Sequence, residues 1–143
     1  MMILNTMLDL TVYAVVGIVI MMLGYLLIDL VIPCNFPKEI KEGNKSVGWV
    51  SAGIYIGLGL IIKTSVESLD GMETAFKLWY GVIDTAFYAV AGIVFFLLGY
   101  FVIDLVNRRY NFNEELKAKN EAIGIMIFGI FIGIALIISG VIR

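Results

Sequence analysis

Histidine is absent from this chain of 143 residues, and cysteine occurs only once, as Cys34. Without histidine the chain lacks the commonest general base, the commonest metal ligand and the side chain that titrates nearest to physiological pH. A lone cysteine excludes an intrachain disulfide and a thiolate metal cluster. Because no carboxylate cluster replaces these groups, we expect no enzyme activity, no metal and no cofactor.

Charged residues are also scarce, at 15% of the chain, with a formal net charge of -2. The basic residues lie in loops rather than on one helical face, so we expect no nucleic-acid partner. Apolar side chains are abundant instead: 61% of residues are hydrophobic, and the mean hydropathy is +0.99. So short a chain cannot bury that much apolar surface in a water-soluble core. We therefore expect the lipid bilayer to solvate it.

Four uncharged segments approach the length that crosses a bilayer: residues 10–28, 46–62, 85–103 and 122–142. A helix of roughly 20 apolar residues spans the hydrocarbon core. Four such segments are too few and too uniformly apolar for a barrel. The sequence predicts an all-α integral membrane protein with four transmembrane helices.

These four segments form two similar pairs. Residues 8–32 align with 83–107 at 14 of 25 identical positions, and residues 36–62 align with 112–138 at 12 of 27. Each half holds an even number of spans, so both should enter the membrane in the same orientation, related by a twofold axis along its normal. The sequence thus predicts two tandem two-helix repeats, residues 1–66 and residues 67–143.

The basic residues indicate the direction of the spans. Seven of the ten lie in the two loops that join the helices of each hairpin. Loops rich in lysine and arginine stay on the cytoplasmic side of the membrane. We therefore expect both hairpin loops to be cytoplasmic and both termini to lie outside.

Glycines recur within the spans at helical spacing. In lipid, small residues let helices approach closely, so helix packing is the preferred interpretation and a hinge or pore wall the alternative. Four helices have limited surface for burying every glycine within one chain. We therefore expect a closed cyclic homo-oligomer. The packing candidates are Gly17, Gly24, Gly53, Gly57, Gly92, Gly99, Gly129 and Gly133.

Two acids occupy the motif Gly-Tyr-x-x-x-Asp, one in each half, as Asp29 and Asp104. Tyr25 and Tyr100 precede them by four residues, so each tyrosine shares a helical face with its acid. Both acids fall near the end of their span, where a carboxylate costs less than at the bilayer centre.

The expected partners of these acids are the N-termini of the second and fourth spans, where Asn44 and Asn120 have the character of N-caps. Arg108, four residues after Asp104, is a further candidate. One interpretation is a structural clasp between helices. The other is an ion or proton site that uses these acids with the tyrosines and asparagines.

The ordered recurrence of these motifs resembles the "domain of unknown function 350" family of small prokaryotic inner-membrane proteins. The resemblance implies four spans in the plasma membrane of a prokaryote and no established reaction. The residues that carry it are Gly24, Tyr25, Asp29, Asn44 and Gly48, and again Gly99, Tyr100, Asp104, Asn120 and Gly124.

Two functions remain open. The first is an oligomeric channel or permeation unit for ions or protons, favoured because intramembrane acids are functional candidates by default. The second is a structural or scaffolding protein whose inner loops recruit a cytosolic partner. Residues 37–41 and 113–117 in those loops predict short capped helices at the inner membrane surface.

Overall fold

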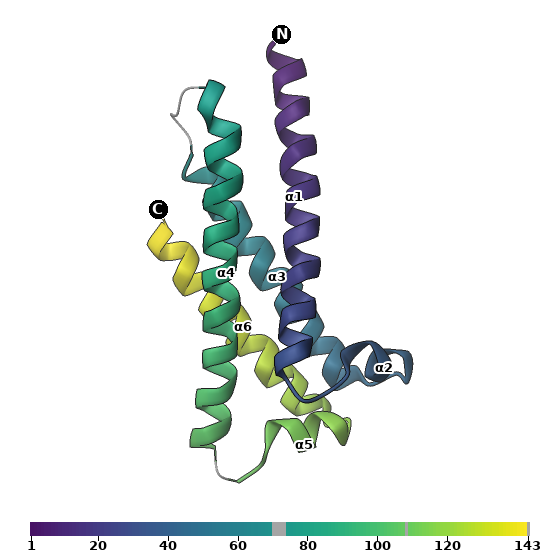
Figure 1. The fold of residues 1–143 in the computed structure, drawn as a ribbon. Coiled ribbons are helices and arrows are strands. Elements are labelled where there is room, and N and C mark those ends of the chain that lie inside the picture. The colour runs from purple at the N-terminus through teal and green to yellow at the C-terminus, as the bar shows by residue number, and fades with distance from the viewer. Residues whose placement is uncertain (70–73, 108, 143) are drawn as a thin grey trace.

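The computed structural model describes residues 1–69, 74–107 and 109–142, and within them it contains helices and no strand (Figure 1). The helices are α1 (Met2–Val31), α2 (Phe36–Lys41), α3 (Lys45–Glu67), α4 (Thr74–Val106), α5 (Phe112–Lys117) and α6 (Glu121–Ile142).

Four of these helices, α1, α3, α4 and α6, are long and apolar enough to cross a membrane, as the sequence predicts. α1 and α4 run in one direction, and α3 and α6 return (Figure 1). The short helices α2 and α5 join the long helices of each pair at the same end of the bundle, which we call the loop end. Both short helices were expected from their capped, mixed-charge sequences.

The least apolar span is the most buried one. α3 has a mean hydropathy of 1.5 over its most apolar window, and 56% of that window is buried, whereas α1 has a hydropathy of 2.5 and is 17% buried. Lipid requires hydrocarbon on the outer helices, whereas small and polar residues can pack between helices. α3 contacts α1, α4 and, most extensively, α6.

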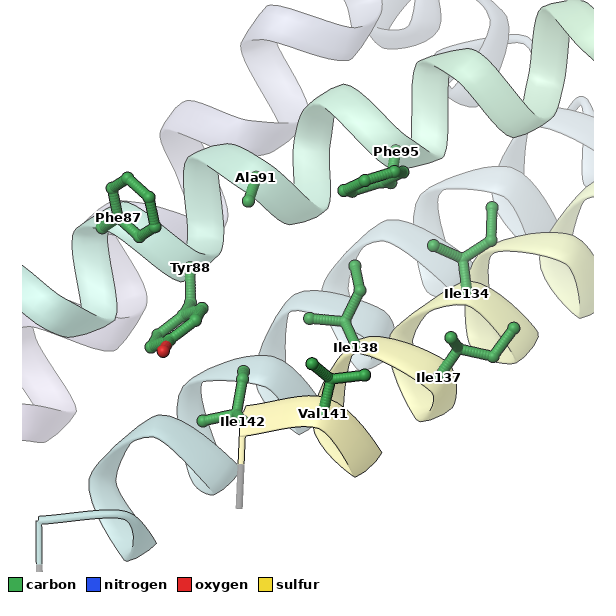
Figure 2. Close-up of a pocket in the computed structure, with 9 residues that line it drawn as sticks. All are labelled: Phe87, Tyr88, Ala91, Phe95, Ile134, Ile137, Ile138, Val141 and Ile142. Atoms are coloured by element: carbon green, nitrogen blue, oxygen red, sulfur yellow. The ribbon is translucent and has the colours of Figure 1, made fainter.

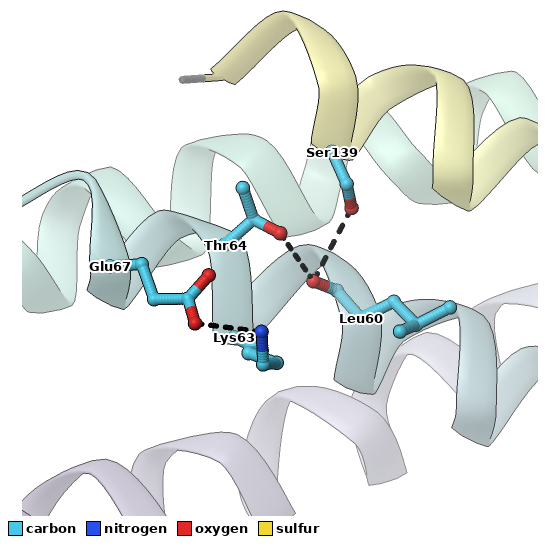
Figure 3. A network of polar contacts seen from close by, with 5 residues as sticks. All are labelled: Leu60, Lys63, Thr64, Glu67 and Ser139. Carbon is cyan, nitrogen blue, oxygen red and sulfur yellow. Dashed lines mark hydrogen bonds and ion pairs between the residues drawn. The ribbon is translucent and has the colours of Figure 1, made fainter.

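Polar groups of α3 also bind inside the bundle. The carbonyl oxygen of Leu60 accepts hydrogen bonds from the Thr64 hydroxyl at 3.1 Å and the Ser139 hydroxyl of α6 at 3.3 Å (Figure 3). On the exposed side of the same helix, Lys63 and Glu67 form an ion pair one helical turn apart at 2.7 Å. The bond from Ser139 joins α6 to α3, and it gives the serine hydroxyl a hydrogen-bond partner that lipid could not provide.

Six of the eight predicted packing glycines contact a neighbouring helix, and two make no such contact within the described residues. A Cβ added at Gly53 would lie 3.0 Å from the Cα of Phe128, and one at Gly57 would lie 2.6 Å from the ring of Phe96. Gly24, Gly92 and Gly99 lie equally close to side chains of neighbouring helices, while Gly17 makes ordinary contact with Ile62.

Gly129 and Gly133, also among the predicted packing positions, make no contact with another helix in the described part of the chain, and the expected contacts between chains stay a prediction for them. Among the described residues, no atom outside the local helix lies within 4 Å of a Cβ built at either position. Gly53 and Gly57, their equivalents in the first half, are buried between α3, α4 and α6. A twofold axis between α3 and α6 would bury both pairs alike, so these contacts do not follow the expected symmetry. Gly124, by contrast, packs against the backbone of Ser46 and was missing from the predicted set.

Candidate functional site at the loop end

The two acids bind the short helices of the loop end. The Oδ1 of Asp29 accepts a hydrogen bond from the backbone N–H of Phe36, the first residue of α2, at 2.7 Å. The Oδ1 of Asp104 accepts one from the N–H of Phe112, the first residue of α5, also at 2.7 Å. Each carboxylate therefore fixes the start of a short helix, where free N–H groups favour an anion.

The prediction that the two acids bind the N-termini of the second and fourth spans is therefore wrong. The N-termini of α2 and α5 offer the same kind of free N–H group, and they follow the acids by only seven and eight residues. The N-termini of α2 and α5 therefore come before those of α3 and α6 in the sequence, and they are the first free N–H groups near the carboxylates. The other candidate partner, Arg108, lies outside the described residues.

The tyrosines of the motif contact the same phenylalanines. The ring of Tyr25 meets that of Phe36 edge-on at 5.8 Å, and the ring of Tyr100 meets that of Phe112 at 5.4 Å. Tyr100 is fully buried, and its hydroxyl donates to the Oδ1 of Asn113 at 2.6 Å. In both halves, then, the acid holds the backbone of one residue while the tyrosine packs on its ring.

Asn44 is the N-cap of α3, as predicted, and it is 2% exposed. Its Oδ1 accepts from the N–H of Ser46 at 3.0 Å, and its Nδ2 donates to Glu39 of α2 at 2.7 Å. The same Nδ2 donates to the carbonyl oxygen of Leu116 in α5, also at 2.7 Å. This one amide thus joins α2, α3 and α5.

Asn120 repeats the local part of this arrangement. It accepts from the N–H of Ala122 at 3.2 Å and donates to Glu115 at 2.7 Å. It is exposed, and no bond from it to the first half is found within the described residues. Sequence repetition correctly predicted both caps but could not reveal which of them crosses between the halves.

The two loops differ in polarity. Beside Asp104, the residues Asn107, Arg109, Asn111 and Glu114 line an open polar pocket of about 350 Å³ together with Tyr110. The corresponding stretch of the first half buries Ile32 and Cys34. Burial, with Glu39 nearby, raises the pKa of the Cys34 thiol from 9.0 to about 11, against the opposing charge of Lys117. A protonated, buried thiol is a poor nucleophile.

The polar side chains of the loop end bind helix termini and one another. Among the described residues, no three histidine, cysteine or acidic side chains gather as a metal site. A second pocket, of about 370 Å³, lies between α4 and α6 and is lined by hydrocarbon apart from the hydroxyl of Tyr88 (Figure 2). Such a lining offers nothing that could replace the hydration shell of an ion.

Comparison with known proteins agrees with a membrane location. The chain is 21% identical over 135 residues to the UPF0719 transmembrane protein YshE of Bacillus subtilis (strain 168), covering 94% of this chain and 93% of that protein. It is 24% identical over 127 residues to a UPF0719 transmembrane protein of Aquifex aeolicus (strain VF5), covering 88% of this chain and 46% of that longer protein. No solved structure matches.

These relatives and the four apolar helices make the chain a multi-pass membrane protein. Residues 1–142 match the family described as Domain of Unknown Function (DUF350). Because that match covers nearly the whole sequence, the chain belongs to this family.

Proposed function

We propose that this chain is a structural membrane protein that presents a rigid polar platform to a cytosolic protein. The platform consists of α2, α5 and the residues that flank them, 35–44 and 111–120. The observation that carries the proposal is the use of both intramembrane acids: Asp29 and Asp104 each accept a 2.7 Å hydrogen bond from the first N–H of a platform helix. Acids used in this way position a surface.

The side of the platform that faces the bundle is anchored by buried side chains. Phe36, Phe112 and Leu116 are fully buried. Asn44 links α2 to α5, and the ammonium of Lys119 donates to the carbonyl of Glu42 at 3.4 Å. Surfaces held in place before binding lose little entropy when a partner docks, which favours recognition.

The side of the platform that faces away from the bundle carries charges of both signs. Its exposed charges are Lys38, Lys41, Glu42, Glu114, Lys117 and Lys119. With the half-buried Glu39 and Glu115, the platform carries four lysines and four glutamates. Its exposed lysines, rather than a net charge, offer contacts to acidic groups of a partner, because complementary charge speeds association and sets orientation. The same lysines favour a cytoplasmic position for the platform.

Permeation of ions or protons is the competing function. It draws support from the position of two acids in spanning helices. Against it, the carboxylates bind backbone N–H groups, and the pocket between α4 and α6 is apolar. A pathway would therefore need to form between chains.

The orientation can be tested with a new cysteine at an exposed position. Glu42→Cys in a Cys34→Ala background should resist a membrane-impermeant maleimide in intact cells and react after permeabilisation. Labelling in intact cells would place the platform outside and remove a cytosolic partner.

The partner itself can be tested by charge reversal after in-cell cross-linking and purification. A protein that binds the platform should co-purify at fixed stoichiometry with the unmodified chain and be lost from the Lys38→Glu, Lys117→Glu variant. The matched control is Lys63→Glu on α3, away from the platform and with its exposed ion pair worth little. The proposal fails if no protein co-purifies at fixed stoichiometry, or if both variants retain it equally.

A further inference from the structure

The polar pocket of about 350 Å³ lies where α4 and α5 meet at the loop end (Figure 1). Its wall has charges of both signs, because Asp104 and Glu114 are acidic and Arg109 is basic. Arg109 and Glu114 are exposed, and neither forms an ion pair with another described residue. The pocket therefore offers a ligand one cationic group and two carboxylates.

The polar groups of this pocket also have unused hydrogen-bonding capacity. Asp104 accepts the N–H of Phe112 through Oδ1, which leaves its second oxygen as a further acceptor. Asn111 accepts two backbone N–H groups of α5 through its Oδ1, which leaves the two N–H donors of its side chain. Tyr110 differs, since its hydroxyl donates to the Sδ of Met126 and its ring stacks on Phe112, so it serves as a wall.

The pocket lies where the two halves of the duplication have diverged. The acid and the N-cap asparagine that fix the short helix occur in both halves. The other pocket residues differ, because the first half has Ile32 in place of Asn107 and Lys38 in place of Glu114. A short helix can therefore be fixed without Asn107 and Glu114, which leaves these two side chains for a ligand.

Exposed hydrocarbon borders the pocket on α4. Leu105 and Val106 are 78% and 76% exposed, and Val102, one turn earlier on the same face, is 55% exposed. α4 is long and apolar enough to cross the membrane, so these side chains contact lipid tails, whereas the pocket beyond the end of the span lies at the level of the headgroups. A molecule with a polar head and hydrocarbon tails fits both surroundings.

We propose that the pocket binds the headgroup of a zwitterionic membrane lipid, in which an ammonium is joined to a phosphate, as in phosphatidylethanolamine. Arg109 and the side-chain amide of Asn111 donate to the phosphate, and the carboxylates of Asp104 and Glu114 accept from the ammonium. The tails lie along the exposed face of α4. The volume suffices, since about 350 Å³ is room for about ten water-sized groups and the headgroup has about eight non-hydrogen atoms.

The two carboxylates distinguish between classes of lipid. Phosphatidylglycerol brings a phosphate without an ammonium, so the acids repel it. The sequence places Arg108 beside Arg109, which makes this anionic lipid the necessary comparison. Phosphatidylcholine has an ammonium without N–H groups and cannot donate a hydrogen bond to either acid. This site goes beyond the platform, because its ligand comes from the membrane and requires no cytosolic protein.

Native mass spectrometry of protein released from mixed bilayers tests the preference. Bilayers of equal parts phosphatidylethanolamine, phosphatidylglycerol and phosphatidylcholine should yield unmodified chains that retain mainly phosphatidylethanolamine. Glu114→Gln should reduce the preference over phosphatidylglycerol roughly twofold to fivefold, as expected for the loss of one charge pair at an exposed site. Arg109→Gln should reduce the retention of both lipids. Equal retention of the three lipids by the unmodified chain, or an unchanged preference in Glu114→Gln, would overturn the proposal.

The matched control is Lys38→Gln, because Lys38 is exposed and occupies the position of Glu114 in the first half. It should retain the same lipid as the unmodified chain. Circular dichroism should show unchanged helical content in all three variants, since each changed side chain is exposed. A loss of preference in Lys38→Gln as large as that in Glu114→Gln would contradict the pocket as the site that selects the lipid.

Soluble phosphoethanolamine distinguishes a lipid from a free compound with the same polar groups. In detergent, short-chain phosphatidylethanolamine should raise the Tm of the unmodified chain more than short-chain phosphatidylglycerol does, and the rise should shrink in Arg109→Gln. Phosphoethanolamine at the same concentration should raise the Tm far less, because it has no tails to cover Val102 and Leu105. An equal rise with phosphoethanolamine would identify a soluble ligand and contradict the membrane lipid.

Discussion

The side-chain amide of Asn44 donates a 2.7 Å hydrogen bond to the carbonyl oxygen of Leu116, 72 residues further along the chain. Both residues are buried, so water cannot replace this bond if it is lost. The bond joins the start of α3 to the last turn of α5. This buried side chain therefore connects the two halves of the platform, beside the exposed bond from Lys119 to Glu42.

Asn44→Ala should lower stability more than Asn120→Ala. Asn120→Ala removes an exposed helix cap, which lowers the free energy of unfolding by about 1 kcal/mol. Asn44→Ala removes the same kind of cap and also leaves the buried carbonyl of Leu116 unpaired, which adds a further loss of about 1–3 kcal/mol. Thermal unfolding in detergent should show the larger fall in Tm for Asn44→Ala. Equal falls would mean that the Leu116 bond contributes nothing.

The turns after α2 and α5 give a second matched pair. Gly43 and Lys119 occupy equivalent positions, with φ values of 76° and 61°. L-residues disfavour this conformation by about 1–2 kcal/mol, whereas glycine adopts it freely. Gly43→Ala should therefore lower the Tm. Lys119→Ala should change the Tm little, because lysine already has a Cβ in this conformation. A larger loss from Lys119→Ala would point to its contact with Glu42 instead.

Cys34 should be slow to label in the folded protein. Its pKa of about 11 leaves the thiol protonated at pH 7 to 9, and only the thiolate reacts readily. Unfolding exposes the thiol and returns its pKa towards the ordinary value, so the labelling rate at pH 8 should rise sharply in denaturant. The rate in the folded protein should keep increasing above pH 9 as the thiolate fraction grows. Equal rates with and without denaturant would contradict the burial.

Local patterns predicted much of this fold. The apolar segments gave four spans, and Asn44 and Asn120 were recognisable as caps, because both features depend on residues a few positions apart. The duplication could not show which glycines are buried, since Gly53 and Gly129 have the same sequence signature and only contacts between helices distinguish them. The partners of Asp29 and the bond from Asn44 to Leu116 depended on the path of the chain in space.

The role of the acids can be tested by Asp29→Asn combined with Asp104→Asn. An asparagine oxygen can still accept from the N–H of Phe36 or Phe112, but it loses the charge-assisted part of the bond, about 1 kcal/mol each. The double variant should fold and assemble with a modestly lower Tm, which serves as the control for the flux measurement.

Ion and proton flux through purified protein in liposomes then tests the central claim, that these acids hold the platform helices. We predict flux at the level of protein-free vesicles for both the unmodified chain and the stable double-asparagine variant. Flux by the unmodified chain that disappears in an intact, assembled double-asparagine variant would contradict the account and assign the acids to a permeation pathway.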